Sequence, residues 1–219
     1  MPTSNWQNIS YNIDLIRKIK PQSILDVGVG FGRWGILLRE FLELWEGVSL
    51  SGNSKPEWKI NIDGLEIFPA YIKEYHNYFY NNIIIADALA YIPKIDENYD
   101  LIIFGDVIEH FEKRQGIELI NTALSKSKYI LINIPLGDNW EQSGNENPYE
   151  EHKSIWTISD FKTYPYKIIK VFDDNIFRKY AVVLISNSEI KLNEKLPPLY
   201  NFKNFLKHKL GLAKLINKN

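Results

Sequence analysis

Acidic and histidine side chains follow an apolar stretch in the middle of the chain. In YDLIIFGDVIEHF, residues 99–111, Asp106 ends the apolar run, and Glu109 and His110 follow closely. A further histidine, His152, lies in NPYEEHKSIWTISDF. Imidazole has a pKa of about 6.5 and can accept a proton at neutral pH. We therefore expect Asp106, His110 and His152 to be catalytic, with His152 or His110 as the base that takes a proton from an acceptor hydroxyl.

A glycine-rich turn lies nearer the beginning of the chain. ILDVGVGFGRWG, residues 24–35, reads as an apolar strand, a turn with Gly28, Gly30 and Gly32, and the start of a helix. Such glycines let the backbone approach a ligand closely. The spacing also fits the dinucleotide fingerprint, but Asp26 would repel a pyrophosphate and attract a cation. S-adenosylmethionine, with an ammonium, a sulfonium and no phosphate, therefore fits this turn better than NAD.

With this turn the chain resembles the class I S-adenosylmethionine-dependent methyltransferases, whose first motif is an acid followed by three alternate glycines. The resemblance runs over about residues 23–186 and implies further cofactor contacts. Glu66 would accept hydrogen bonds from both ribose hydroxyls, and Ile67 would flank the adenine. Asp87 and the backbone of Ala88 would lie at the adenine amino group, and Asp106 would project toward the transferring methyl. The expected acceptor is an oxygen or nitrogen of a small molecule, such as a sugar or glycan precursor.

Two alternatives stay open. The pattern Asp-x-x-Glu-His with a distant His-x-x-x-Trp-Thr also resembles the metal-dependent small-RNA 3′-terminal 2′-O-methyltransferases. That resemblance implies Asp106, Glu109, His110 and His152 as metal ligands, although that family has Glu where this chain has Asp106. The net charge of −1 argues against a nucleic-acid partner. The other alternative is a non-catalytic, cofactor-binding partner subunit.

Strand-like runs alternate with helical periodicity, which is typical of βα units. Strands are predicted over 23–27, 60–66, 83–86, 100–105 and 129–134, and a hairpin over 166–172 and 180–186. Helices are predicted over 9–19, 33–44, 71–78, 113–125 and from Ser159. The polar stretch 135–151 is too long for a plain connection. The expected fold is an α/β, doubly wound, mostly parallel Rossmann-like sheet with an antiparallel last strand. The resemblance to the class I methyltransferases implies seven strands in the order 3-2-1-4-5-7-6.

Length and composition predict one methyltransferase domain, residues 1–190, and a basic amphipathic tail, 191–219. The chain has no cysteine, which excludes disulfides and thiolate catalysis. No apolar run approaches the ~20 residues of a membrane span, and the first residues do not resemble a secretory signal, so a cytoplasmic protein is expected. The stretch 201–219 contains five lysines and no acid. It could lie on the inner membrane surface, or dock on its own domain or a second subunit.

Overall fold

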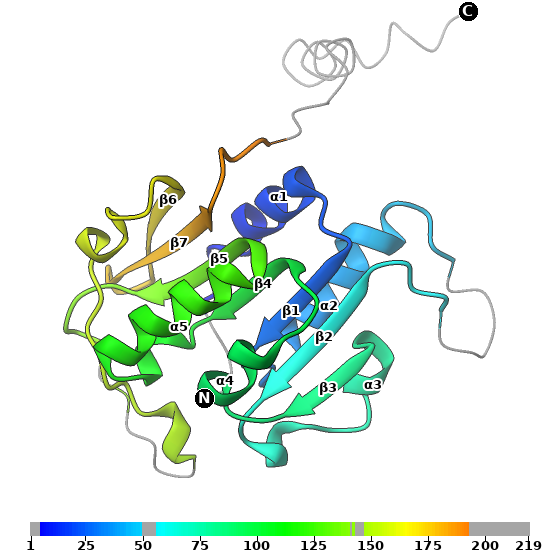
Figure 1. The fold of residues 1–219 in the computed structure, drawn as a ribbon, viewed down its shortest axis with the longest axis horizontal. Helices are drawn as coiled ribbons and strands as arrows, with labels where there is room; N and C mark the ends of the chain where they lie inside the picture. The colour runs from blue at the N-terminus through cyan, green and yellow to red at the C-terminus, as the bar shows by residue number, and fades with distance from the viewer. Residues whose placement is uncertain (1–4, 50–55, 141, 143–146, 193–219) are drawn as a thin grey trace, which may run out of the picture.

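A seven-stranded sheet forms the centre of the computed structural model, which describes residues 5–49, 56–140, 142 and 147–192 (Figure 1). The strands are β1 (Ser23–Val27), β2 (Asn61–Glu66), β3 (Asn82–Ile85), β4 (Tyr99–Gly105), β5 (Ser127–Pro135), β6 (Tyr166–Asp173) and β7 (Lys179–Ser186). Their order is β3-β2-β1-β4-β5-β7-β6. Strand β7 runs antiparallel to β5 and β6, and the other pairs are parallel. The predicted fold class and strand order are confirmed.

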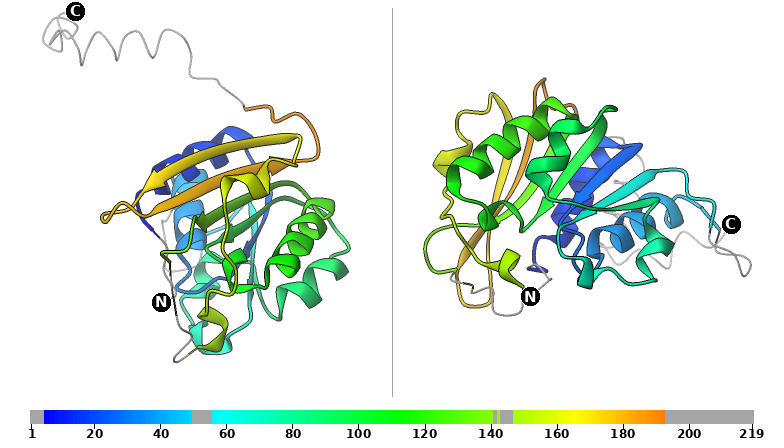
Figure 2. Two further views of the ribbon diagram at one scale, coloured as in Figure 1. Left: turned by 90° about the vertical axis from the view of Figure 1, so that its left-hand side faces the viewer. Right: turned by 60° about the horizontal axis from the view of Figure 1, so that its bottom comes forward.

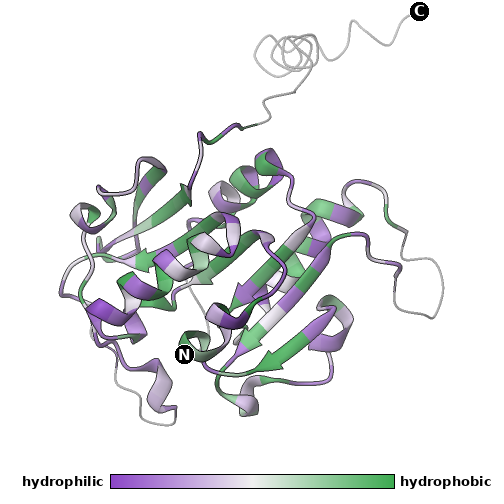
Figure 3. Ribbon diagram, in the orientation of Figure 1, coloured by the Kyte–Doolittle hydropathy of each residue, from purple (hydrophilic) through white to green (hydrophobic). Residues whose placement is uncertain are grey.

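Helices cover both faces of this sheet, as the two further views show (Figure 2). Helices α1 (Ile9–Ile19) and α2 (Arg33–Arg39) lie on one face, and α4 (Ala88–Tyr91) and α5 (Lys113–Ser125) on the other. Successive side chains of a strand point to opposite faces, so Ile24 packs in the cluster with α1 and α2, and Leu25 in the cluster with α4 and α5. The central strands β4 and β5 are accordingly mainly apolar, whereas β2 includes the polar residues Asn61, Asp63 and Glu66 (Figure 3).

The connections from β1 to β2 and from β2 to β3 differ from the predicted regular helices. The helix predicted over 33–44 ends as α-helix at Arg39 and continues as one π-helical segment, η1 (Glu40–Leu44). The helix predicted over 71–78 is wrong. That region contains a 3₁₀ turn, η2 (Pro69–Tyr71), and a one-turn helix, α3 (His76–Phe79). The ring of His76 explains the short α3, because its Nδ1 accepts a hydrogen bond from the Lys73 backbone N–H at 2.9 Å and so competes with helical pairing.

Short 3₁₀ turns lie before and after β4 and before β6. The short helix α4 was not predicted, and the turn η3 (Ile92–Lys94) follows it; the turn η4 (Ile108–His110) follows β4. The helix expected from Ser159 is the single turn η6 (Ile158–Phe161), closed by a capping box between Thr157 and Asp160. Pro165 lies shortly beyond this turn. Because the residue before a proline disfavours helical geometry, the helix cannot readily continue past this point.

The carboxyl ends of the parallel strands define one edge of the sheet, and the antiparallel β7 begins at that same edge. Pro135, the last residue of β5, lies opposite Tyr180, the second residue of β7. Loops from five strands therefore meet here, which is where ligands bind in open α/β sheets.

The predicted tail lies almost entirely outside the described residues, so its separation from the domain and its membrane contact remain predictions. Within the described ranges, no helix is long and apolar enough to cross a membrane.

Candidate active site

The glycine turn after β1 is a close-packed junction between strands. Gly28 has a φ of +78° and Gly30 a φ of +52°. This is the left-handed backbone conformation, which residues other than glycine adopt only at an energetic cost. A Cβ atom on Gly28 would lie 2.5 Å from Cγ2 of Val107, the residue after Asp106. Glycine at position 28 thus allows the turn to approach the segment that follows β4.

The backbone amides of the three glycines in this turn already have partners inside the protein. The N–H of Gly28 donates to the carbonyl oxygen of Leu65 at 2.8 Å, that of Gly32 to the carbonyl oxygen of Val29 at 2.8 Å, and that of Gly30 to Oε2 of Glu66 at 2.9 Å. These amides are therefore not available to bind a phosphate. The turn differs in this respect from glycine loops whose free amides cradle phosphates.

Glu66, the last residue of β2, is held at this turn by two backbone groups. Its Oε2 accepts from Gly30, and its Oε1 accepts from the N–H of Phe68 at 2.8 Å. Each carboxylate oxygen has a further lone pair, and the side chain lines the cavity described below. Glu66 can therefore accept two more hydrogen bonds from adjacent hydroxyls of a ligand.

A cavity of about 660 Å³ runs along this edge of the sheet. The predicted cofactor-binding residues that line it are Gly28, Gly30, Glu66, Ile67, Asp87, Ala88 and Asp106. The predicted catalytic residues His110 and His152 line it as well, and so does Glu109. Two predicted cofactor-binding residues, Asp26 and Gly32, are not in its wall.

Asp26 lies behind the turn, fully buried. The hydroxyl of Tyr80 donates to its Oδ2 at 2.6 Å. Burial is the main reason why the pKa of Asp26 rises to about 8; the hydrogen bond from Tyr80 opposes this shift, and the charge of Glu66 adds to it. At pH 7 the carboxyl group is therefore mostly neutral in the ligand-free protein. A cation bound in the cavity would favour its ionised form without touching it.

The chain bends sharply where β4 ends. Asp106 has a φ of +56°, a conformation that Asp tolerates better than most residues, and its N–H donates to the carbonyl oxygen of Asn133 at 3.0 Å. The bend leads directly into η4, which places Glu109 in the cavity wall with 1% of its surface exposed. No described residue hydrogen-bonds Oε2 of Glu109. Burial and the nearby Asp106 raise the pKa of Glu109 well above its usual range.

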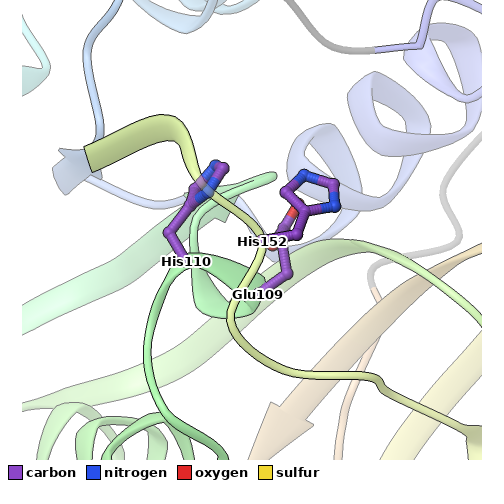
Figure 4. Close-up of side chains that lie close together, drawn as sticks. All are labelled: Glu109, His110 and His152. Carbon is purple, nitrogen blue, oxygen red and sulfur yellow. The ribbon is translucent and has the colours of Figure 1, made fainter. Parts of the chain in front are cut away.

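Glu109, His110 and His152 form one cluster, to which η4 contributes two residues and the segment after η5 (Pro148–Glu150) the third (Figure 4). One ligand atom from each lies within 4.8 Å of the others. The N–H groups of Lys153 and Ser154 donate to the Glu109 carbonyl oxygen at 2.9 and 3.1 Å, which fixes this segment against η4.

The protonation states of the two histidines leave ring nitrogens with free lone pairs. Burial lowers the pKa of His110 to about 4 and also lowers that of His152, so both rings are neutral at pH 7. Nδ1 of His110 lies 3.1 Å from the carbonyl oxygen of Glu151, which can only accept, so Nδ1 carries the proton in the neutral ring and Nε2 is the unprotonated nitrogen.

The cluster fits a divalent cation reasonably closely. Two ligand atoms that each lie ~2.1 Å from one ion are about 3–4 Å apart, so a small adjustment would close the group around a metal. Of the four predicted metal ligands, the structure brings together Glu109, His110 and His152. Asp106 lines the same cavity but does not belong to this group.

Two further cavity residues, Trp140 and Arg178, were not predicted. Trp140 follows β5, and Arg178 immediately precedes β7. The guanidinium carbon of Arg178 lies 3.9 Å from the centre of the Trp140 ring. The predicted strand order contained a usable signal, because a strand antiparallel to its neighbours must begin where the parallel strands end.

Sequence comparisons identify no relative, since no family model and no curated protein sequence matches the chain. Solved structures do match. A methyltransferase from Archaeoglobus fulgidus described as SAM-dependent aligns with a TM-score of 0.55 and 17% identity, over 81% of this chain and 94% of that one. WbdD, crystallised with a kinase inhibitor, aligns at 0.61 and 14%, over 89% of this chain but 43% of WbdD. The methyltransferase domain of bacterial CtHen1-C aligns at 0.52 and 14%, over 83% and 98%. The chain therefore has the fold of the class I S-adenosylmethionine-dependent methyltransferases.

Proposed function

We propose that the protein is an S-adenosylmethionine-dependent methyltransferase that modifies an oxygen or nitrogen of a small molecule, such as a sugar or glycan precursor. The observation that carries the proposal is the pairing of the glycine turn with Glu66. The glycine amides of the turn donate hydrogen bonds to groups of the protein, and the group that faces the ligand is the carboxylate of Glu66. Such a site favours a ribose and a positive charge and disfavours a pyrophosphate, which supports S-adenosylmethionine over NAD.

The other cavity residues suit the rest of this cofactor. Glu66 would hold the two ribose hydroxyls, Ile67 would pack beside the adenine, and Asp87 with the backbone of Ala88 would lie at the adenine amino group. Asp87 is well placed for this, because its Oδ1 accepts from the Leu89 N–H at 2.9 Å and the side chain is thereby fixed at the start of α4. S-adenosylmethionine supplies an electrophilic methyl group bonded to a positively charged sulfur.

The opposite side of the cavity would receive the acceptor. Methyl transfer requires the attacking atom in line with the methyl carbon, which the protein achieves mainly by positioning. Asp106 and His152 both line the cavity, and the neutral His152 ring could take the proton of an attacking hydroxyl. Its lowered pKa makes it a weak base. An amine that arrives deprotonated needs no such base.

The metal-dependent alternative, including RNA 2′-O-methylation, has one specific observation in its favour. The cluster of Glu109, His110 and His152 is compact, and Glu109 has a buried oxygen that no described residue hydrogen-bonds. A divalent ion in this cluster would promote loss of the proton from an acceptor hydroxyl. The neutral histidines suit such a ligand set better than they suit unaided base catalysis.

Thermal denaturation with ligands tests these proposals. S-adenosylhomocysteine at 100 times its dissociation constant should stabilise the fold by ~2.7 kcal/mol and raise the melting temperature by about 5–10 °C. NAD at the same concentration should have no effect. Stabilisation by NAD alone, or by neither ligand, would contradict the proposal.

Manganese separates the two mechanisms. A further rise in melting temperature with Mn²⁺ that is lost in Glu109→Gln would favour the metal-dependent reaction. Binding of S-adenosylhomocysteine without methyl transfer to any hydroxyl or amine acceptor, with or without Mn²⁺, would favour the non-catalytic partner subunit.

A further inference from the structure

We infer that the acceptor carries an oxyanion, a carboxylate or a phosphate, and that Arg178 binds it at the end of the cavity away from Glu66. This inference rests on the proposed methyltransferase function and specifies its substrate class. It starts from the position of a cation. S-adenosylmethionine has one oxyanion of its own, the methionine carboxylate, but the residues proposed to hold the cofactor lie along β1, β2 and α4, whereas Arg178 directly precedes β7 on the cavity wall.

Arg178 is held by Asp174, which lies outside the cavity wall, and by Trp140, which lies in it. Its backbone N–H donates to Oδ1 of Asp174 at 2.8 Å, and its Nε donates to Oδ2 of the same carboxylate at 2.8 Å. Its guanidinium plane packs on Trp140, whose own Nε1 donates to the carbonyl oxygen of Lys179 at 3.0 Å. The side chain is therefore ordered before any ligand arrives, which reduces the entropic cost of binding.

The terminal nitrogens of Arg178 remain available. Neither Nη1 nor Nη2 hydrogen-bonds within the described part of the chain, and the side chain is 33% exposed, on the cavity wall. Asp174 engages Nε, and the Trp140 ring covers one face of the guanidinium. Neither contact uses the N–H groups of Nη1 and Nη2. Two parallel N–H groups match the geometry of a carboxylate or phosphate.

The sheet order gives the distance that such an acceptor must span. Asp106 follows β4 and Arg178 precedes β7, and β5 lies between the two strands. Neighbouring strands are ~4.8 Å apart and residues rise ~3.4 Å along a strand. Because Gly105 is level with Asn133 and Asn133 with Val182, Arg178 lies three residues along the strand from the level of Asp106, and the two backbones are roughly 14 Å apart. A small molecule can bridge this distance, with its reacting atom near Asp106 and its oxyanion at Arg178.

Two further cations, Arg33 and Lys153, line the same cavity. Glu150, an acid of the cavity wall, accepts a hydrogen bond from the hydroxyl of Tyr71, which follows β2, so this acid lies on the side of Glu66 and not beside Arg178. The acids Asp106 and Glu109 lie nearer the centre, at the proposed site of methyl transfer.

Calorimetric titration of simple dianions into the protein tests the inference. Malonate is the probe for a carboxylate and pyrophosphate the probe for a phosphate. Saturating S-adenosylhomocysteine occupies the glycine-turn end, and chloride keeps the ionic strength constant. The wild type should bind at least one probe saturably, and Arg178→Gln should weaken that binding at least tenfold. Lys179→Gln is the matched control, because its side chain is 63% exposed, pairs with Asp173 and is not part of the cavity wall.

Each outcome decides a separate question. The probe that shows the Arg178-dependent binding identifies the oxyanion as carboxylate or phosphate. Absence of saturable binding of both probes, or equal binding by wild type and Arg178→Gln, would overturn the inference. Unchanged affinity of Arg178→Gln for S-adenosylhomocysteine would show that the fold and the cofactor site are intact. If the wild type itself does not bind S-adenosylhomocysteine, the proposed function fails instead, whatever the probes do.

Discussion

Replacing Glu66 with Gln should selectively weaken binding of the cofactor ribose. In the wild type both carboxylate oxygens are anchored by backbone N–H groups, at 2.9 Å from Gly30 and 2.8 Å from Phe68. Each oxygen keeps a lone pair for one ribose hydroxyl. Glutamine has a single carbonyl oxygen, so its NH₂ group must face one of the two backbone donors and cannot accept from it.

The expected magnitude follows from the loss of charge. A hydrogen bond to a charged group contributes ~1.5–3 kcal/mol and a neutral one ~0.5–1.5 kcal/mol. The difference over two hydroxyls is about 2–3 kcal/mol, which corresponds to a roughly 30- to 150-fold loss in affinity for S-adenosylhomocysteine. Isothermal titration calorimetry measures this directly. Glu40→Gln, which changes an exposed acid of η1, is the matched control and should bind like the wild type.

A ligand analogue separates the ribose contact from general damage to the turn. With the 2′,3′-dideoxy analogue of S-adenosylhomocysteine, Glu66→Gln and the wild type should bind within about threefold of each other, because the hydroxyls that distinguish them are gone. Glu66 does not hold the ribose if Glu66→Gln lowers the affinity for S-adenosylhomocysteine by less than about threefold. The same conclusion follows if the substitution lowers the affinity for the dideoxy analogue as much as it lowers that for S-adenosylhomocysteine.

Three further substitutions test the packing behind the site. Gly28→Ala should lower the free energy of unfolding by about 2–5 kcal/mol in urea denaturation, from its positive φ and its clash with Val107; adding Val107→Ala should restore part of this loss, and strict additivity would refute the clash. Because the pKa of Asp26 is raised to about 8, its protonated form stabilises the fold at low pH and that contribution is lost as pH rises from about 4 to 8. Asp26→Asn should remove this slope of up to ~1.4 kcal/mol per pH unit, and an unchanged stability profile would contradict the shift. Arg39→Ala should cost about 3–5 kcal/mol because it leaves Glu43 buried without its ion-pair partner; a melting temperature like that of the wild type would refute this.

The predicted fold followed from periodicity and from the glycine turn. Apolar strands alternating with helices fix a doubly wound sheet, because only a parallel arrangement with helices on both faces buries such strands. The same reasoning placed Glu66, Asp87 and Asp106 at strand ends, and all three line one cavity. It failed for residues 71–78, where the ring of His76 hydrogen-bonds the local backbone and residue pattern alone suggested a longer helix.

The sequence by itself determined the alternation of strands and helices, the position of the glycine turn and the set of candidate polar residues, since these depend on local pattern. The order of the strands in the sheet came from the family resemblance that the glycine turn carries. Only the tertiary structure decided how those residues are used. It buried Asp26 behind the turn against Tyr80, satisfied the turn amides internally, and grouped Glu109 and His110 with His152. It also brought Arg178 to the cavity. These outcomes depend on contacts between segments far apart in the chain, where burial and neighbouring charges set the protonation and exposure of each group.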